Sequence, residues 1–195
     1  MSRFIEESIA KAGLMPVLAA RRSGDLDTVR ASVTTWGAAD LLALGAIADL
    51  TRTDDVGAVV RIHEPAHLPG EGADVTWVDL STSTSELDFL RAVAIARICA
   101  RKGARIGVDW TKCGMELAQV ALGFGASELR GPMTRKSGLP ILEGEKLKLK
   151  GQGMVELQAI KKREIAALVT HAGRLPVFAS ETPARESSKE EVAGV

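Results

Sequence analysis

RIGVDWTKCGMELAQVALGFGASELR, residues 105–130, is the stretch that decides the fold. Residues 105–110 predict a short strand, and residues 112–124 predict a helix whose apolar residues recur at spacings of three and four. Gly125 follows where a left-handed residue commonly ends a helix. Residues 127–129 then predict another strand. A strand, a helix and a second strand in this order are typical of parallel α/β units, in which right-handed crossovers make the strands parallel neighbours.

The residues before this stretch extend the same pattern. AVVRIH (58–63) and DVTWVDL (74–80) predict strands, and residues 86–101 predict an amphipathic helix. EPAHLPGEGAD (64–74) predicts a loop because it holds two prolines and two glycines. Nearer the N-terminus, helices are predicted over residues 4–18, 24–31 and 35–52, the last with a broad apolar stripe.

The C-terminal part interrupts this rhythm. Residues 132–153 contain four glycines and two prolines and predict a segment outside the alternation of strands and helices. Within it, KLKLK (146–150) is a candidate edge strand whose lysines would oppose pairing with other chains. A last helix is predicted over residues 155–172, and residues 181–195 predict a disordered tail. We therefore predict one α/β domain over residues 1–180, with a helical part at 1–52 and a sheet-bearing part at 57–180.

Composition excludes several classes of protein. Hydrophobic residues make up 46% and charged residues 26% of the 195 residues, which is typical of a soluble domain. Basic and acidic residues balance at 25 each, so no overall charge favours nucleic acid or an anionic membrane. The sequence has no apolar run of membrane-spanning length, and its charged start is unlike a secretory signal. We therefore expect a cytoplasmic protein with no nucleic-acid or membrane partner.

Four stretches, taken in order, resemble one enzyme family. They are DLLALGAIADLTR (40–52), ELDFLRAVAIARI (86–98), WTKCGMELAQVALGFGASELRG (110–131) and KKREIAALVTHAGRLPVF (161–178). In pattern and order they are similar to segments of aminofutalosine synthase, dehypoxanthine futalosine cyclase and the deazaflavin-forming (F420) radical-SAM enzymes. The resemblance implies a (β/α) barrel, of which this chain would hold a part. It also implies a link to menaquinone biosynthesis through the futalosine pathway.

The cysteines differ from the family pattern. Its members have a Cys-x3-Cys-x2-Cys loop after the first strand, which holds the iron–sulfur cluster. Here AVVRIH runs directly into EPAHLPGEGAD, so about five strand–helix units and the cysteine loop look deleted. Cys99 and Cys113 lie 14 residues apart on separate predicted elements and cannot rebuild the loop; they are interpreted as buried thiols. We therefore expect no radical-SAM chemistry and no cofactor.

The resemblance places a candidate site at the barrel mouth, where such folds carry their chemistry. Its residues are Asp109, Trp110, Glu128 and Arg130, with Arg135 and Lys136 nearby. Carboxylate and guanidinium groups in this arrangement could bind an anionic small molecule or a carboxylate of a partner. Structural alternatives remain open: an ion pair between Glu128 and one of the nearby cations, a cap of the next helix by Asp109, and simple packing of Trp110.

Two functions follow from these residues. The first is a non-catalytic paralogue that binds a partner or a metabolite. The second is a small enzyme in which Glu128 or Asp109 is the acid–base group and Arg130 clamps an anion. No metal site is expected, because Pro65 opposes a helix that would pair His63 with His67.

The partial barrel predicts a partner. Three or four parallel strands cannot close a barrel, so the sheet keeps open edges and is expected to expose an apolar inner face. We therefore expect a homo-oligomer or a complex with a full-length radical-SAM barrel protein.

Overall fold

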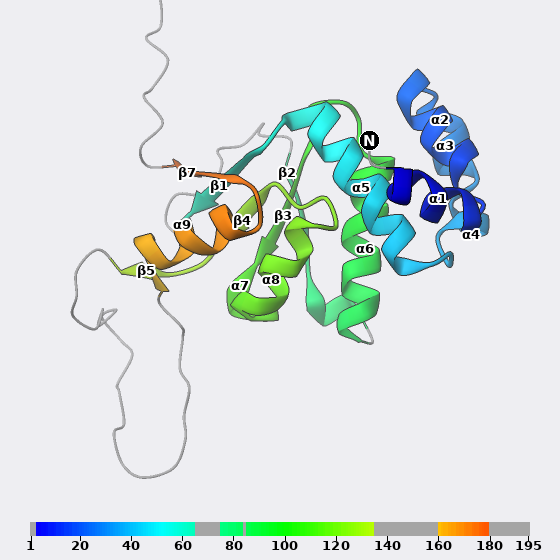
Figure 1. Cartoon of the computed structure of the whole chain (residues 1–195). Coiled ribbons are helices and arrows are strands. Elements are labelled where there is room, and N and C mark those ends of the chain that lie inside the picture. Colours follow the sequence, from blue (N-terminus) through cyan, green and yellow to red (C-terminus); the bar gives the residue numbers. More distant parts are fainter. Residues whose placement is uncertain (1–2, 65–74, 84, 135–159, 180–195) are drawn as a thin grey trace, which may run out of the picture.

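A computed structural model describes residues 3–64, 75–83, 85–134 and 160–179 of the chain (Figure 1). The predicted KLKLK strand, the tail, and most of the two glycine-rich and proline-rich segments lie outside these residues. Within the described part of the chain, no helix is both long enough and apolar enough to cross a membrane.

A five-stranded parallel sheet forms the centre of the fold, in the order β2-β3-β4-β1-β7. Its strands are β1 (Val59–His63), β2 (Val75–Val78), β3 (Arg105–Asp109), β4 (Glu128–Arg130) and β7 (Leu175–Phe178). The predicted α/β class and the parallel pairing are thus confirmed. β1 lies between β4 and β7, so residues distant in the sequence meet in the middle of the sheet.

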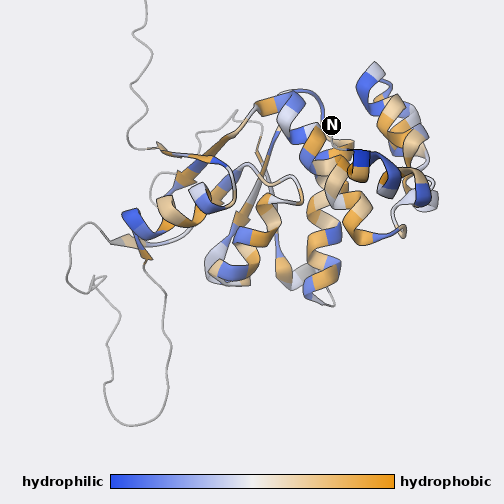
Figure 2. Ribbon diagram, in the orientation of Figure 1, coloured by the Kyte–Doolittle hydropathy of each residue, from blue (hydrophilic) through white to orange (hydrophobic). Residues whose placement is uncertain are grey.

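Helices cover one face of this sheet. They include α5 (Leu41–Val56), α6 (Glu86–Cys99), α8 (Met115–Leu122) and α9 (Lys162–His171). The steps from β2 to β3 and from β3 to β4 run in the same direction, so right-handed crossovers place α6 and α8 on the same side. The covered side chains are apolar and almost fully buried: Val60, Ile62, Ile106, Val108 and Leu129. The core therefore lies between the sheet and this helical layer (Figure 2).

Side-chain caps position the two longest helices. The Asp40 carboxylate accepts a hydrogen bond from the backbone N–H of Ala43 at the start of α5 (2.9 Å), and the Ser85 hydroxyl accepts one from Asp88 at the start of α6 (3.1 Å). The predicted helix over residues 112–124 is instead two helices, α7 (Trp110–Cys113) and α8. Gly114, with φ of 79°, separates them, because this backbone conformation interrupts an α-helix.

The N-terminal helices form a layer beside α5, at the opposite end of the molecule from β7 (Figure 1). They are α1 (Arg3–Lys11), α2 (Met15–Ser23), α3 (Leu26–Ala31) and α4 (Val33–Trp36). The single helix predicted over residues 4–18 is wrong, because Gly13, with φ of 70°, divides it into α1 and α2. A short 3₁₀ helix (Leu80–Thr82) follows β2.

Three short strands were not predicted. β7 pairs with β1 although it contains Pro176, which a strand tolerates at the edge of a sheet. β5 (Met133–Thr134) and β6 (Ile160–Lys161) form a separate two-stranded parallel ladder before α9. The described part of α9 begins at Lys162, later than the predicted start at residue 155.

Candidate functional site

Charged side chains gather on the face of the sheet opposite the helices. Successive strand residues point to opposite faces, so the residues between the buried apolar ones share the other face. The register pairs Arg61 of β1 with Glu128 of β4, and Asp109 of β3 with Arg130 of β4. We call this set the polar face: Arg61, His63, Trp77, Arg105, Asp109, Glu128 and Arg130. Val59, Val75, Leu175 and Val177 lie on the same face by register, so in the described strands it is mixed, and not uniformly apolar as expected.

Glu128 is the buried centre of the polar face. Its side chain is 0% exposed, and its Oε2 lies 2.5 Å from Nε2 of His63, whose side chain is 4% exposed. β4 is a central strand, with β1 on one side and β3 on the other, and this position surrounds the carboxylate with protein. A carboxylate removed from water requires such partners, because burial disfavours its charge. The contact with His63 therefore stabilises Glu128 in its buried position.

Two arginines approach the other oxygen of the same carboxylate. Oε1 of Glu128 lies 3.6 Å from Nη1 of Arg61 and 3.8 Å from Nε of Arg105. Neither contact is a hydrogen bond, and Oε1 has no hydrogen-bond partner among the residues that the structure describes. The side chains of Arg61 and Arg105 are 35% and 34% exposed. Glu128 thus attracts two guanidinium groups without using their hydrogen-bond donors.

Trp77 forms an aromatic wall beside these charges. Its indole lies over Gly107, where a Cβ atom would come within 2.5 Å of the ring. The guanidinium carbon of Arg130 lies 4.4 Å from the centre of the Trp77 ring, and the His63 ring meets the indole edge to face at 5.9 Å. Arg130 also donates a hydrogen bond from Nε to Oδ2 of Asp109 at 2.8 Å. Glycine at position 107 therefore makes room for the aromatic side chain.

Asp109 and Trp110 have the structural roles that the sequence left open. Oδ1 of Asp109 accepts a hydrogen bond from the backbone N–H of Thr111 (2.9 Å), so this carboxylate caps α7. Trp110 is 2% exposed and packs against Gly131, where a Cβ would lie 2.1 Å from the ring. The Cys113 thiol lies nearby, and its pKa is raised to about 11. Burial is the main cause, and the negative charge of Asp109 is the second.

The structure brings three predicted site residues to the polar face: Asp109, Glu128 and Arg130. Trp110 is buried beside them, whereas Arg135 and Lys136 lie outside the described residues. Glu128 does form ion pairs, but Arg130 pairs with Asp109 and not with Glu128.

Sequence reasoning missed four residues of the polar face: Arg61, His63, Trp77 and Arg105. The signal for two of them is the alternation in VVRIH, where Arg61 and His63 fall between the apolar residues of β1. The register that places them beside Glu128 joins residues 65 positions apart in the sequence.

The charge balance of the polar face favours an anion. Three guanidinium groups face two carboxylates, so one positive charge is left over even when His63 is neutral. Among the residues that the structure describes, no group of three potential metal ligands occurs. The chemistry that these side chains offer is the binding of a carboxylate or another oxyanion by arginine.

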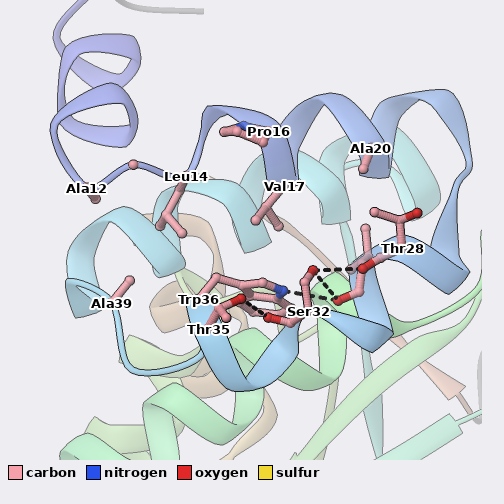
Figure 3. Close-up of a pocket in the computed structure, with 12 residues that line it drawn as sticks. Ala12, Leu14, Pro16, Val17, Ala20, Thr28, Ser32, Thr35, Trp36 and Ala39 are labelled. Atoms are coloured by element: carbon pink, nitrogen blue, oxygen red, sulfur yellow. Dashed lines mark hydrogen bonds between the residues drawn. The ribbon is translucent and has the colours of Figure 1, made fainter.

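A separate, mainly apolar cavity lies among the N-terminal helices. Its volume is about 270 Å³, and Leu14, Pro16, Val17 and Trp36 contribute to its walls (Figure 3). The Trp36 indole N–H already donates to the backbone carbonyl of Val29 at 3.0 Å. The Ser32 and Thr35 hydroxyls likewise donate to nearby backbone carbonyls. These polar groups of the cavity wall are thus already hydrogen-bonded. None of the predicted site residues lines this cavity.

One curated protein is similar to part of the chain. Aminodeoxyfutalosine synthase of Thermus thermophilus is 32% identical over 94 residues, which are 48% of this chain and 23% of that enzyme. No protein-family profile matches. The chain thus spans about a quarter of the relative's length, and the similarity supports a relationship to the radical-SAM family that the four stretches resemble.

Proposed function

We propose that this chain binds an anionic small molecule, or a carboxylate of a partner protein, at the polar face. The observation that carries the proposal is the geometry of Arg61 and Arg105, which both approach Oε1 of Glu128 at 3.6–3.8 Å. Each is about one-third exposed and keeps its N–H groups free of that oxygen. Two guanidinium groups held beside one carboxylate, with no hydrogen bond to another described residue, suit bidentate recognition of a carboxylate.

The fold supports a place for this site within a barrel-like architecture. β4 neighbours β1, as the last and first strands of a closed barrel do, and the polar face then corresponds to the lumen at the carboxyl ends of the strands. We propose that the chain is a partial barrel from the radical-SAM relatives. The similarity to aminodeoxyfutalosine synthase supports a link to the futalosine pathway.

A binding experiment tests the proposal. Isothermal titration calorimetry with succinate and citrate is expected to show saturable binding. Arg61→Gln and Arg105→Gln should each weaken it about tenfold, since each removes a charge-assisted contact. Arg163→Gln, on the exposed side of α9, is the matched control and should bind as the unaltered protein does. Equal affinity of all four proteins would overturn the proposal.

The chain is also proposed to lack radical-SAM activity. Its two cysteines lie 14 residues apart, with Cys99 at the end of α6 and Cys113 at the end of α7. A cluster held by cysteine thiolates needs more ligands than these two provide. Anaerobic reconstitution with iron and sulfide should therefore give no stoichiometric four-iron cluster. Formation of 5′-deoxyadenosine under reducing conditions would contradict this part of the proposal.

An acid–base enzyme is the second candidate function. The contact of 2.5 Å between His63 and Glu128 favours it, because a histidine oriented by a carboxylate is a common general base. Asp109 is the weaker acid–base candidate, since it caps α7 and pairs with Arg130. If Glu128→Gln abolishes turnover of a bound compound while its binding persists, the enzyme is favoured over the binding protein.

We further propose that another chain covers the open edges of the sheet. β2 and β7 lie at the two ends of the strand order, and unpaired edges favour pairing with a further strand. A second copy of this chain or a barrel relative could supply it. Light scattering coupled to size-exclusion chromatography should therefore give a mass above that of one chain, 20.6 kDa. A monomer across the micromolar range would exclude the homo-oligomer.

A further inference from the structure

A second pocket, lined by polar and charged side chains, lies between the helices. None of its lining residues belongs to the sheet. Its volume is about 230 Å³. α2 supplies Arg21 and Arg22, α5 supplies Thr51 and Asp55, and Lys102 follows α6. Three cations thus line a pocket that shares no residue with the polar face.

The hydroxyl of Thr51 is buried without a partner. Thr51 is 4% exposed, and its Oγ1 makes no hydrogen bond within the described part of the chain. Helical threonines usually donate to the carbonyl four residues earlier, as Thr53 does to Asp49 (2.9 Å) and Thr170 does to Ala166 (2.8 Å). A buried hydroxyl without a hydrogen bond is unfavourable. Thr51 is one of the residues that line the pocket, so a side chain of the pocket wall carries an unsatisfied polar group.

Arg21 presents a second unused donor. Its Nη2 donates to Oδ2 of Asp55 at 2.5 Å, and both side chains are more than nine-tenths buried. Its Nε, also buried, has no hydrogen-bond partner among the described residues. Oδ2 of Asp55 lies 4.0 Å from Arg97 as well, so two guanidinium groups share this carboxylate. The negative charge of Asp55 is thus already balanced.

The rim of the pocket keeps a positive excess. Lys102 is exposed, and Arg22, about half exposed, lies 3.9 Å from Asp54. With Arg21, the lining has three cations and two carboxylates. Both unpartnered groups, the Thr51 hydroxyl and Arg21 Nε, are donors of hydrogen bonds. The Thr51 hydroxyl can also accept, but Arg21 Nε can only donate, so a ligand with acceptor oxygens satisfies both, and the surrounding charge favours an anion.

We propose that this pocket binds a phosphate group, through the donors of Thr51 and Arg21 and the charges of Arg22 and Lys102. The phosphate comes either from free inorganic phosphate or from a small phosphate monoester. This site is independent of the polar face, and variants of Arg61 or Arg105 leave it unchanged.

Thermal unfolding with phosphate tests the proposal. Inorganic phosphate should raise the Tm in a saturable manner, and potassium chloride at the same ionic strength should not. Thr51→Val keeps the shape of the side chain and removes the donor, so it should weaken phosphate binding about tenfold. Lys102→Gln and Arg22→Gln, both at the surface, should weaken it in the same direction. Thr170→Val is the matched control and should bind phosphate normally.

Two outcomes would overturn the proposal. One is an equal effect of phosphate and chloride on the unaltered protein. The other is undiminished phosphate binding by Thr51→Val or by Lys102→Gln. A parallel titration with glycerol 3-phosphate separates the sources, because tighter binding than that of inorganic phosphate identifies a monoester, and weaker binding identifies free phosphate.

Discussion

The two faces of the sheet use the same strands for different purposes. The helix-covered face holds aliphatic side chains such as Ile62 and Ile106, which are fully buried. On the polar face, the neighbouring positions hold Arg61 and Arg105, about one-third exposed. A single-residue step along a strand therefore changes the role of a side chain from packing to charge. Side chains that stabilise the fold and side chains of the candidate site thus occupy alternating positions of one sequence.

Adjacent substitutions on β3 should separate the two faces most strongly. Ile106→Ala removes buried aliphatic carbon between the sheet and the helices, so the free energy of unfolding should fall by about 3 kcal/mol. Arg105→Ala alters a partly exposed ion pair and should change it by less than about 1 kcal/mol. Urea denaturation followed by circular dichroism measures both values. Similar losses for the two variants would remove the distinction between the faces.

Glu128→Gln should produce an intermediate effect, since this residue is buried on the polar face. The amide cannot balance His63, Arg61 and Arg105 as the carboxylate does, so stability should fall by about 1–3 kcal/mol. Glu164→Gln, at the exposed start of α9, is the matched control and should stay within about 0.5 kcal/mol. A stability of Glu128→Gln equal to that of the control would show that the buried carboxylate contributes nothing.

Asp79 should give the smallest effect, with a clear dependence on pH. A hydrogen bond from Lys112, together with those from Ser81, lowers the pKa of Asp79 from 3.8 to about 2. Because its pKa is lower in the folded state, Asp79 stabilises the protein above about pH 4, and this contribution is lost as pH falls towards 2. Asp79→Asn should therefore lower the Tm slightly at pH 6, and the difference should narrow below pH 4. A difference that is the same at pH 6 and pH 3 would contradict the assignment.

The sequence predicts the helix-covered face better than the polar face. Periodic apolar residues indicate α5, α6 and the first four strands of the sheet, because burial requires that spacing. Three helix breaks were missed. Gly13 and Gly114 change the backbone direction within otherwise continuous patterns, and residues 37–40 separate α4 from α5 within the helix predicted over residues 35–52. β7 was missed because Pro176 argues against a strand in the sequence. The proline is tolerated because β7 lies at the edge of the sheet.

The partners of Glu128 were beyond prediction for a different reason. Arg130 is two residues away in sequence, yet its partner is Asp109, whereas His63 comes from a strand that the order of the sheet brings alongside β4. Long-range register decides which charges meet, and the local pattern does not contain it.

The double variant Arg61→Gln, Arg105→Gln tests the central claim most directly, with succinate affinity and urea stability measured on the same preparation. The account predicts that succinate binding is abolished while the protein still unfolds cooperatively, with a smaller loss in the free energy of unfolding than the loss of about 3 kcal/mol expected for Ile106→Ala. Undiminished succinate binding, or a protein that no longer folds, would contradict the division of the sheet into a packing face and a binding face.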